Sequence, residues 1–275
     1  MRNFKNTRNF KNIKDIRKFA IKKTKEAIKR NYANEEFVLI QAINAYNELS
    51  KSYNLFFERI NEWFGLYFPE ISLTSINQLN EFFKGFENKN KLEINDFYRV
   101  FDDKSKAEAI YQKYLNTSGR NLEENEKKLI IMFLKYIKNT DETLKNFEEY
   151  LKQTSNKLMP NTTYLTDEKI AAELLNKAGS LEKLSIMPSS TIQLLGAEKA
   201  LFKHIKFGSK PPKYGVLFKL PAITNAKRNI RGKIARLYAA KISIGLKGDI
   251  ISKRFIAKEL KDSIDKTLEK IKKNN

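Results

Sequence analysis

The 275-residue chain contains no cysteine and one histidine, His204. Without cysteine it forms no disulfide, no zinc–thiolate site and no thiol nucleophile. A single imidazole also excludes a multi-histidine metal site and leaves no second imidazole for acid–base catalysis. No Gly-Lys-Ser/Thr or GxGxxG string, which would cradle nucleotide phosphates, occurs in the sequence. These absences disfavour an enzyme, and we expect no catalytic residue, no bound metal and no cofactor.

Long apolar runs are missing as well. No run approaches the ~18 residues that cross a bilayer, and the first residues lack the apolar core of a secretory signal. Hydrophobic residues still make up 41% of the chain, which is enough to bury a core and excludes wholesale disorder. We therefore expect a folded, soluble, intracellular protein of one or two domains.

Acidic residues are scarce in the C-terminal part of the chain. Lys and Arg number 53 against 32 Asp and Glu, a net charge of +21. The middle of the chain is mildly acidic and both ends are basic. Between Glu198 and Asp249 there is no carboxylate, whereas 13 Lys and Arg residues lie there. A folded surface with charge of one sign is typical of proteins that bind a polyanion, most often nucleic acid.

Two long stretches carry apolar residues at alternating steps of three and four, the heptad spacing of coiled coils. The first covers residues 39–67 and the second residues 130–158, and a proline follows each. Because proline stops a helix, each stretch predicts one long helix. We expect the two helices to form an antiparallel coiled-coil stalk with a small helical tip at about residues 70–120. A globular helical bundle is the alternative.

The first heptad helix has an apolar face wider than one partner helix covers. It is rich in aromatic residues, and phenylalanines also lie beside the heptad positions. We therefore predict a homodimer in which a second copy covers the remaining apolar face. The residues assigned to this coiled-coil and dimer seam are Leu39, Tyr46, Tyr53, Phe56, Phe57, Ile60, Trp63 and Phe64.

After Pro160, prolines and glycines become frequent between short apolar stretches. The expected elements are helices at residues 167–177, 197–205, 226–243 and 255–273 and an extended segment at residues 215–220. The predicted fold is therefore all-α. It comprises a basic N-terminal helix at residues 1–33, a coiled-coil domain at residues 34–159 and a compact, mostly helical RNA-binding domain at residues 160–275.

The cationic segment combines charge with an aromatic side chain. Lys199, Lys203 and Lys206 recur at helical spacing, and a proline-rich turn then presents Tyr214 among lysines. Lysines attract phosphates, and a base that stacks on an aromatic ring gains ~1–3 kcal/mol. A cationic surface that serves only solubility is the alternative. The predicted RNA-binding residues are Lys199, Lys203, His204, Lys206, Lys210, Lys213, Tyr214, Arg228, Arg231, Lys233 and Arg236.

Three segments have distinctive sequences: NKAGSLEKLSIMPSSTIQLLGAEKALFKHIKFGSKPPKYGVLF (residues 176–218), RGKIARLYAAK (231–241) and IQAINAYNELSKSYNLFFERINEWFGLYFPE (40–70). They resemble the Nop family, the archaeal scaffold proteins of box C/D ribonucleoproteins and their eukaryotic nucleolar relatives. The resemblance covers roughly residues 20–275. Lys203 stands where the family usually has Arg, and Tyr214 where it often has His. The family motif residues are Gly196, Ala197, Glu198, Lys199, Ala200, Leu201, Phe202 and Lys203.

The resemblance implies a scaffold without enzymatic activity. Its Nop domain would recognise a kink-turn RNA together with a small ribosomal-type protein bound to it, and its coiled coil would pair two copies. The family supports guide-directed 2′-O-methylation of RNA, including ribosomal RNA, by fibrillarin. The implied location is the cytoplasm of an archaeon, or the nucleolus of a eukaryote.

Only about 33 residues precede the coiled coil, where the family carries a full domain that holds fibrillarin. We therefore expect that this chain alone does not recruit fibrillarin. A helical coiled-coil interaction protein with only non-specific RNA binding is the second hypothesis for function, and a methyltransferase or nuclease the third.

Overall fold

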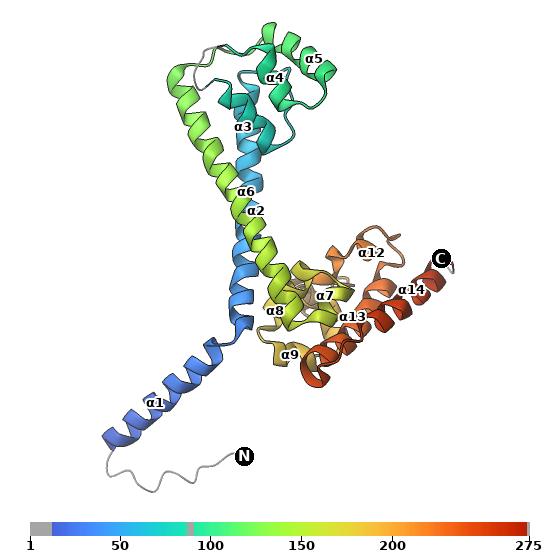
Figure 1. Ribbon diagram of the computed structural model, residues 1–275. Coiled ribbons are helices and arrows are strands. Elements are labelled where there is room, and N and C mark those ends of the chain that lie inside the picture. The colour runs from blue at the N-terminus through green and yellow to red at the C-terminus, as the bar shows by residue number, and fades with distance from the viewer. Residues whose placement is uncertain (1–12, 87–90, 274–275) are drawn as a thin grey trace. The chain divides into compact units, whose positions relative to one another are not determined.

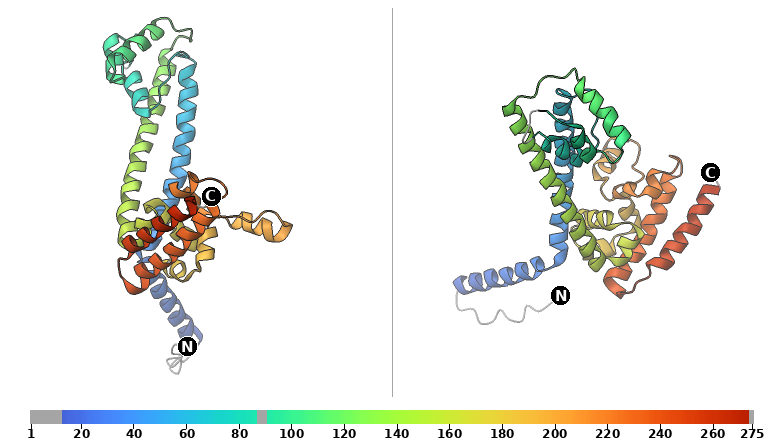
Figure 2. Two further views of the ribbon diagram at one scale, coloured as in Figure 1. Left: turned by 90° about the vertical axis from the view of Figure 1, so that its right-hand side faces the viewer. Right: turned by 45° about the horizontal axis from the view of Figure 1, so that its top comes forward.

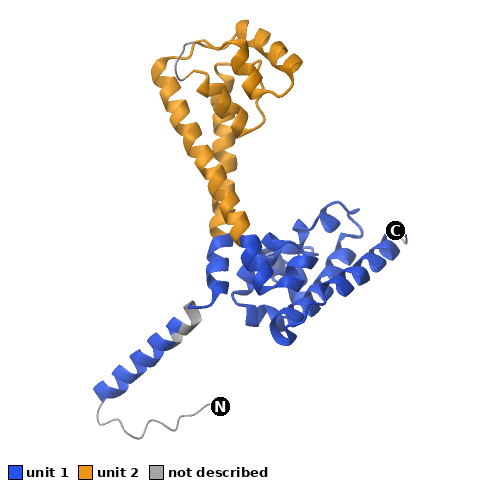
Figure 3. Ribbon diagram, in the orientation of Figure 1, with its two compact units in different colours: residues 1–43, 151–275 blue, residues 44–150 orange. Residues whose placement is uncertain are grey.

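The computed structural model describes residues 13–86 and 91–273, and every regular element in these ranges is a helix (Figure 1). The predicted all-α class is confirmed. The chain divides into two compact units, Met1–Ile43 with Leu151–Asn275, and Asn44–Tyr150 (Figure 3). We refer to them as the C-terminal unit and the central unit. In the described ranges, no helix is both long and apolar enough to cross a membrane.

Two long helices, α2 (Glu35–Gly65) and α6 (Glu124–Leu158), run through the central unit. The Tyr46 hydroxyl donates to Glu148 Oε1 at 2.7 Å, and the Phe56 ring contacts Phe133 with ring centroids 5.8 Å apart. Because later residues of α2 meet earlier residues of α6, the helices run antiparallel. Both predicted long helices are confirmed. Their supercoiling into a coiled coil stays a prediction.

Three short helices form the tip of the central unit: α3 (Ile76–Lys84), α4 (Ile94–Val100) and α5 (Lys104–Leu115). Their aromatic side chains pack into one core in which several ring pairs meet edge to face, an arrangement that stabilises ring pairs. Phe82 contacts Phe64 of α2 at 5.2 Å between centroids. This core buries Ile60 and Phe64 almost completely. Rings of the tip cover Phe64 within the same chain, and neither of these two buried seam residues is open to a second copy.

The end of α2 is tied to the loop before α6. Glu70 accepts hydrogen bonds from Ser118 N at 2.8 Å, from Ser118 Oγ at 2.6 Å and from Thr117 Oγ1 at 2.7 Å. These donors lower the pKa of Glu70 to about 2. A Cβ on Gly119 would lie 2.0 Å from the Tyr67 carbonyl oxygen, so glycine is required where the two segments cross.

The C-terminal unit packs around α13 (Arg231–Lys247), whose Ile234, Tyr238 and Ile242 are buried. Helices α7 (Pro160–Leu165), α10 (Ser189–Leu194) and α14 (Ala257–Lys273) pack against it. α1 (Ile13–Tyr32) matches the predicted N-terminal helix from residue 13 on; residues 1–12 lie outside the described ranges. The other elements are α7 (Pro160–Leu165), α8 (Glu168–Ala178), α9 (Leu181–Ile186), α10 (Ser189–Leu194), α11 (Glu198–Phe207), η1 (Val216–Lys219), α12 (Pro221–Thr224), η2 (Gly248–Ser252) and α14 (Ala257–Lys273).

Two local predictions are wrong. Residues 216–219 form a 3₁₀ helix, whereas an extended segment was expected at 215–220. The helix predicted from residue 226 starts at Arg231, because residues 227–230 form a turn. In both places a backbone N–H donates to the carbonyl three residues earlier in the chain. Phe218 N, for example, donates to Gly215 O at 3.0 Å. Short apolar runs do not distinguish such turns from strands.

Candidate nucleic-acid interface

Helix α11 projects from the C-terminal unit (Figure 2, left, in orange). None of its ten residues is buried, although it carries large apolar side chains. Phe202, Ile205 and Phe207 are 61%, 74% and 70% exposed. An amphipathic helix normally buries its apolar face against the rest of its domain. An exposed apolar face of this kind indicates an interaction surface.

The segments before and after α11 contact each other at the base of the helix. Val216 N donates to Leu195 O at 2.7 Å, and a Cβ on Gly215 would lie 2.0 Å from that carbonyl oxygen. Gly196 has a φ of +91°, a conformation that glycine adopts without strain. These contacts hold together the two segments that flank α11 and fix the base of the helix on the C-terminal unit.

The predicted RNA-binding residues of α11 differ in their exposure and in their contacts. Lys199 and Lys203 are exposed and form no ion pair with any residue in the described ranges. The Lys206 ammonium lies 5.4 Å from the centroid of the Phe207 ring. Glu198 Oε1 instead accepts from Gly196 N at 2.6 Å, so its carboxylate stays at the helix start. His204 is half-buried, and its Nδ1–H donates to the Ser209 carbonyl, holding the turn after α11.

Tyr214 is part of a stacked column. Its ring lies parallel to that of Phe218, with centroids 4.7 Å apart and an interplanar angle of 10°. The Arg231 guanidinium lies 5.6 Å from the Phe218 centroid on the same column. Arg231 also donates from Nε to Ala226 O at 2.9 Å and from Nη2 to Thr224 O at 2.8 Å. This arginine therefore holds the fold around the aromatic pair.

Lys213 and the start of α13 lie against each other. A Cβ on Gly232 would meet Lys213 Cδ at 3.5 Å, so the lysine stem packs on this glycine. Gln193 Nε2 donates to Lys213 O at 2.7 Å and anchors the same segment to α10. The structure thus brings Lys213, Tyr214 and Arg231 together. The remaining predicted cations are exposed, and they are Lys210, Arg228, Lys233 and Arg236.

Phe218 and Gln193 belong to this surface, and sequence reasoning missed them. If residues 215–220 were extended, as expected, Phe218 would lie about 13 Å from Tyr214, because an extended chain rises ~3.3 Å per residue. The 3₁₀ helix shortens that distance and lets the rings stack. Gln193 gave no signal, because its contact joins segments twenty residues apart.

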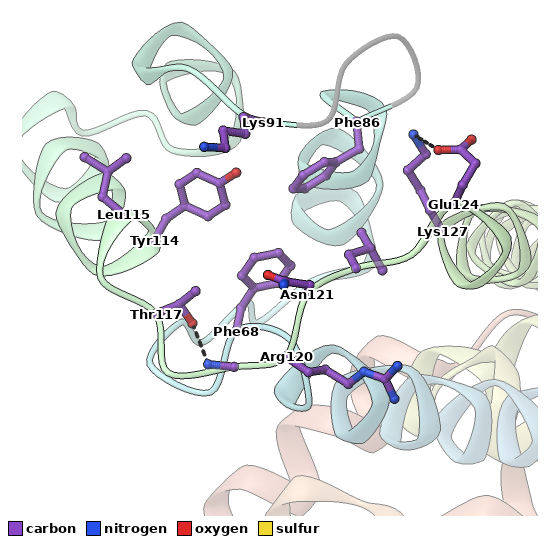
Figure 4. A pocket seen from close by; sticks show the side chains of 12 residues that line it. Phe68, Phe86, Lys91, Tyr114, Leu115, Thr117, Arg120, Asn121, Glu124 and Lys127 are labelled. Atoms are coloured by element: carbon purple, nitrogen blue, oxygen red, sulfur yellow. Dashed lines mark hydrogen bonds and ion pairs between the residues drawn. The ribbon is translucent and has the colours of Figure 1, made fainter.

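A cavity of about 580 Å³ lies in the tip of the central unit (Figure 4). Phe68, Phe86 and Tyr114 line one side of it. Glu124 is the one carboxylate among its described lining residues, and it pairs with the buried Lys127 at 2.6 Å. A second carboxylate or an imidazole for general acid–base chemistry is absent from that lining. In the described ranges, no three His, Cys, Asp or Glu side chains cluster to hold a metal.

Comparison with known proteins points to one family. A family model named Nop, described as "snoRNA binding domain, fibrillarin", matches residues 45–270. An uncharacterized NOP5 family protein of Methanocaldococcus jannaschii is 35% identical over 96% of this chain and 65% of its own length. Nucleolar protein 56 of Dictyostelium discoideum is 31% identical over 86% of this chain and 44% of its own length. The chain therefore spans less than two thirds of these relatives.

A solved structure agrees in fold. A chain in the crystal structure of a fibrillarin/Nop5p complex superposes with a TM-score of 0.51 at 23% identity, covering 94% of this chain and 78% of that one. The family model extends from the first half of α2 into α14 and so includes the cationic surface described above. On this evidence the chain belongs to the Nop family, whose matching domain is described as snoRNA-binding.

Proposed function

We propose that the chain is an RNA-binding scaffold of a box C/D-type ribonucleoprotein. The surface formed by α11, the turn at residues 208–215 and the start of α13 would recognise a kink-turn RNA together with a small ribosomal-type protein bound to it. The observation that carries the proposal is the fold of the carboxylate-free segment. It presents unpaired lysines, exposed apolar side chains and a stacked aromatic column on one unit.

The chemistry of α11 suits a composite partner. Lys199 and Lys203 offer charge to phosphates, whereas Phe202 and Ile205 offer apolar area that phosphates do not use. A surface made of RNA and protein satisfies both kinds of side chain.

The aromatic column suits base stacking. Because Phe218 stacks on Tyr214 and Arg231 in turn lies over Phe218, the Tyr214 ring is fixed before any RNA arrives. A base that stacks on it would lengthen an existing column, with little further loss of side-chain freedom. Tyr214 would thus keep the stacking role of an aromatic ring where the family often has His.

We also propose that a second copy of the chain covers part of the central unit. On α6, Leu129, Met132 and Tyr136 are 47%, 62% and 54% exposed and recur at spacings of three and four. Such a stripe supports helix pairing. Light scattering that gave a monomer mass across micromolar concentrations would contradict this dimer.

Fibrillarin and 2′-O-methylation enter the proposal as functions of the complete particle. The chain spans 65% and 44% of the two relatives described above, and we expect that it does not retain fibrillarin by itself. A pull-down of fibrillarin by the purified chain, after nuclease treatment, measures this. Stoichiometric retention would contradict the expectation. The protein would act in the archaeal cytoplasm, or in the nucleolus if it is eukaryotic.

One binding comparison tests the core of the proposal. The full chain is titrated onto a kink-turn RNA with and without the small kink-turn-binding protein, and onto a straight duplex of equal length as control. A composite surface predicts much tighter binding when the small protein is present, and only on the kink-turn RNA. Equal binding to all three would favour the second hypothesis, an interaction protein with non-specific RNA affinity.

A further inference from the structure

A second exposed aromatic and cationic patch lies at the end of α13 away from Tyr214. We call it the distal patch; it comprises Tyr164, Ile251, Lys253, Arg254 and Phe255. The Tyr164 and Phe255 rings meet edge to face with centroids 5.8 Å apart. Their exposures are 50% and 53%, and that of Ile251 is 65%. The patch follows the turn between α13 and α14, which Figure 1 draws at the opposite end of α13 from α12.

A buried polar network fixes the turn that carries this patch. Asp249, 4% exposed, accepts hydrogen bonds from Asn161 N and Nδ2 and from Thr162 N and Oγ1, all at 2.8–3.0 Å. Asn161 also donates to Arg254 O at 2.8 Å and accepts from Ile256 N at 2.6 Å. The main chain on both sides of residues 250–253 is therefore tied to α7.

The fixed turn includes unusual backbone. Residues 248–252 form a π-helix, and Lys253 has a φ of +53°, which is uncommon for a residue other than glycine. The network requires none of the exposed apolar side chains, since it uses main-chain groups with Asn161, Thr162 and Asp249. A rigid turn that nevertheless displays Ile251 and Phe255 to solvent indicates a binding surface.

The charge around the patch selects the kind of partner. Lys247, Lys253, Arg254 and Lys258 are exposed along this segment, with Glu259 as the one exposed carboxylate between residues 247 and 259. On α9, which packs against the turn, Glu182 and Lys183 offset each other. An apolar protein partner would have to desolvate these cations without supplying counter-charges. RNA supplies phosphates for the cations and planar bases for the rings.

We propose that the distal patch binds unpaired RNA nucleotides, as a second RNA contact of the C-terminal unit. It is separated from the α11 surface by the length of α13, ~25 Å for 17 residues at 1.5 Å per residue. The assignment goes beyond kink-turn recognition and rests on the proposed function only in taking RNA as the partner.

The test uses the full chain and a short fluorescein-labelled oligouridine, which forms no kink-turn. Fluorescence anisotropy gives affinity and its salt dependence, and ultraviolet crosslinking with peptide mapping gives the contact site. The variants are Phe255→Ala and Lys253→Gly; glycine adopts the positive φ, so the turn is kept while the charge is removed. Lys270→Ala, an exposed lysine near the end of α14, is the matched charge control, and circular dichroism confirms folding.

We expect Phe255→Ala to weaken oligouridine binding about tenfold through lost stacking. Lys253→Gly should lower the log–log salt slope by ~0.7, the value for one phosphate contact on a single strand, and Lys270→Ala should change neither. Crosslinks should fall in peptides that contain Tyr164 or Phe255. Crosslinks confined to residues 198–215, or unchanged binding by Phe255→Ala, would overturn the proposal. The proposal would also be overturned if Phe255→Ala changed the molecular mass measured by light scattering and left the RNA affinity unchanged. If kink-turn recognition failed but these crosslinks remained, the distal patch would stand alone.

Discussion

The two units place their aromatic side chains differently. In the central unit, Phe64, Phe82 and Phe97 lie at most 2% exposed within one core. In the C-terminal unit, Phe202, Phe207 and other rings lie at the surface beside lysines and arginines. The charges differ too, since the central unit carries both signs and the segment between Glu198 and Asp249 carries one. The comparison teaches that a ring surrounded by other rings stabilises a core, whereas a ring among unpaired cations is available to a ligand.

Truncating a buried ring of the central unit should give the largest effect. Phe82 contacts the rings of Phe64, Phe68 and Phe97 at 5.1–5.7 Å. Phe82→Ala should lower the free energy of unfolding by ~3–5 kcal/mol because it leaves a cavity. Phe207→Ala, in the exposed set, is the matched control and should change it by no more than ~0.5 kcal/mol. Denaturant unfolding measures both, and equal losses would break the comparison between the units.

Removing the ring of Tyr214 should act on binding. Tyr214→Ala should weaken RNA binding by ~1–3 kcal/mol if the ring stacks on a base. Tyr214→Phe keeps the stack with Phe218 and should cost little. Titration of kink-turn RNA with the small protein present measures both variants. A loss with Tyr214→Phe as large as with Tyr214→Ala would assign the effect to the hydroxyl, against the stacking argument.

Variants of the predicted phosphate-contacting residues should differ in their effect from a variant of Arg231, which has a structural role. Lys199→Ala, Lys203→Ala and Arg236→Ala should each flatten the log–log salt dependence of RNA binding by ~0.9 on a duplex, and less on a single strand. Arg231→Ala should instead lower stability by ~1–3 kcal/mol, because its guanidinium bonds two carbonyls and lies over Phe218. Unchanged slopes in all three variants would refute these phosphate contacts.

The smallest expected effect is a pH dependence in the central unit. The folded-state pKa of Glu70 is about 2, below its ordinary 4.5. Its contribution to stability is therefore complete above pH ~4.5 and is lost as the pH falls towards 2. Thermal unfolding between pH 5 and 2 should show a shallower acid loss for Glu70→Gln than for the unchanged protein. Identical profiles would show that the bonds to Thr117 and Ser118 do not bear on stability.

The sequence by itself determined the long helices and the place of the cationic surface. Heptad spacing is a local pattern, and α6 ends two residues before Pro160, because proline does not fit the interior of a helix. The absence of carboxylates between Glu198 and Asp249 likewise belongs to the sequence, so one-signed charge follows from it directly. The helix expected at residues 197–205, with Gly208 beyond its C-terminal end, corresponds to α11 (Glu198–Phe207).

Only the tertiary structure decided which side chains serve the fold and which face solvent. Arg231 reads as a phosphate contact in the sequence, yet carbonyls of the preceding loop engage its guanidinium. Phe64 reads as part of a coiled-coil and dimer seam in the sequence, yet Phe82 and Phe83 of the tip pack against it within the same chain. The distal patch gave no sequence signal, because Asn161 and Asp249 are 88 residues apart. Sequence periodicity depends on residues a few positions apart, and it predicts which face of a helix is apolar. The element that packs on that face is set by contacts between segments distant in the chain.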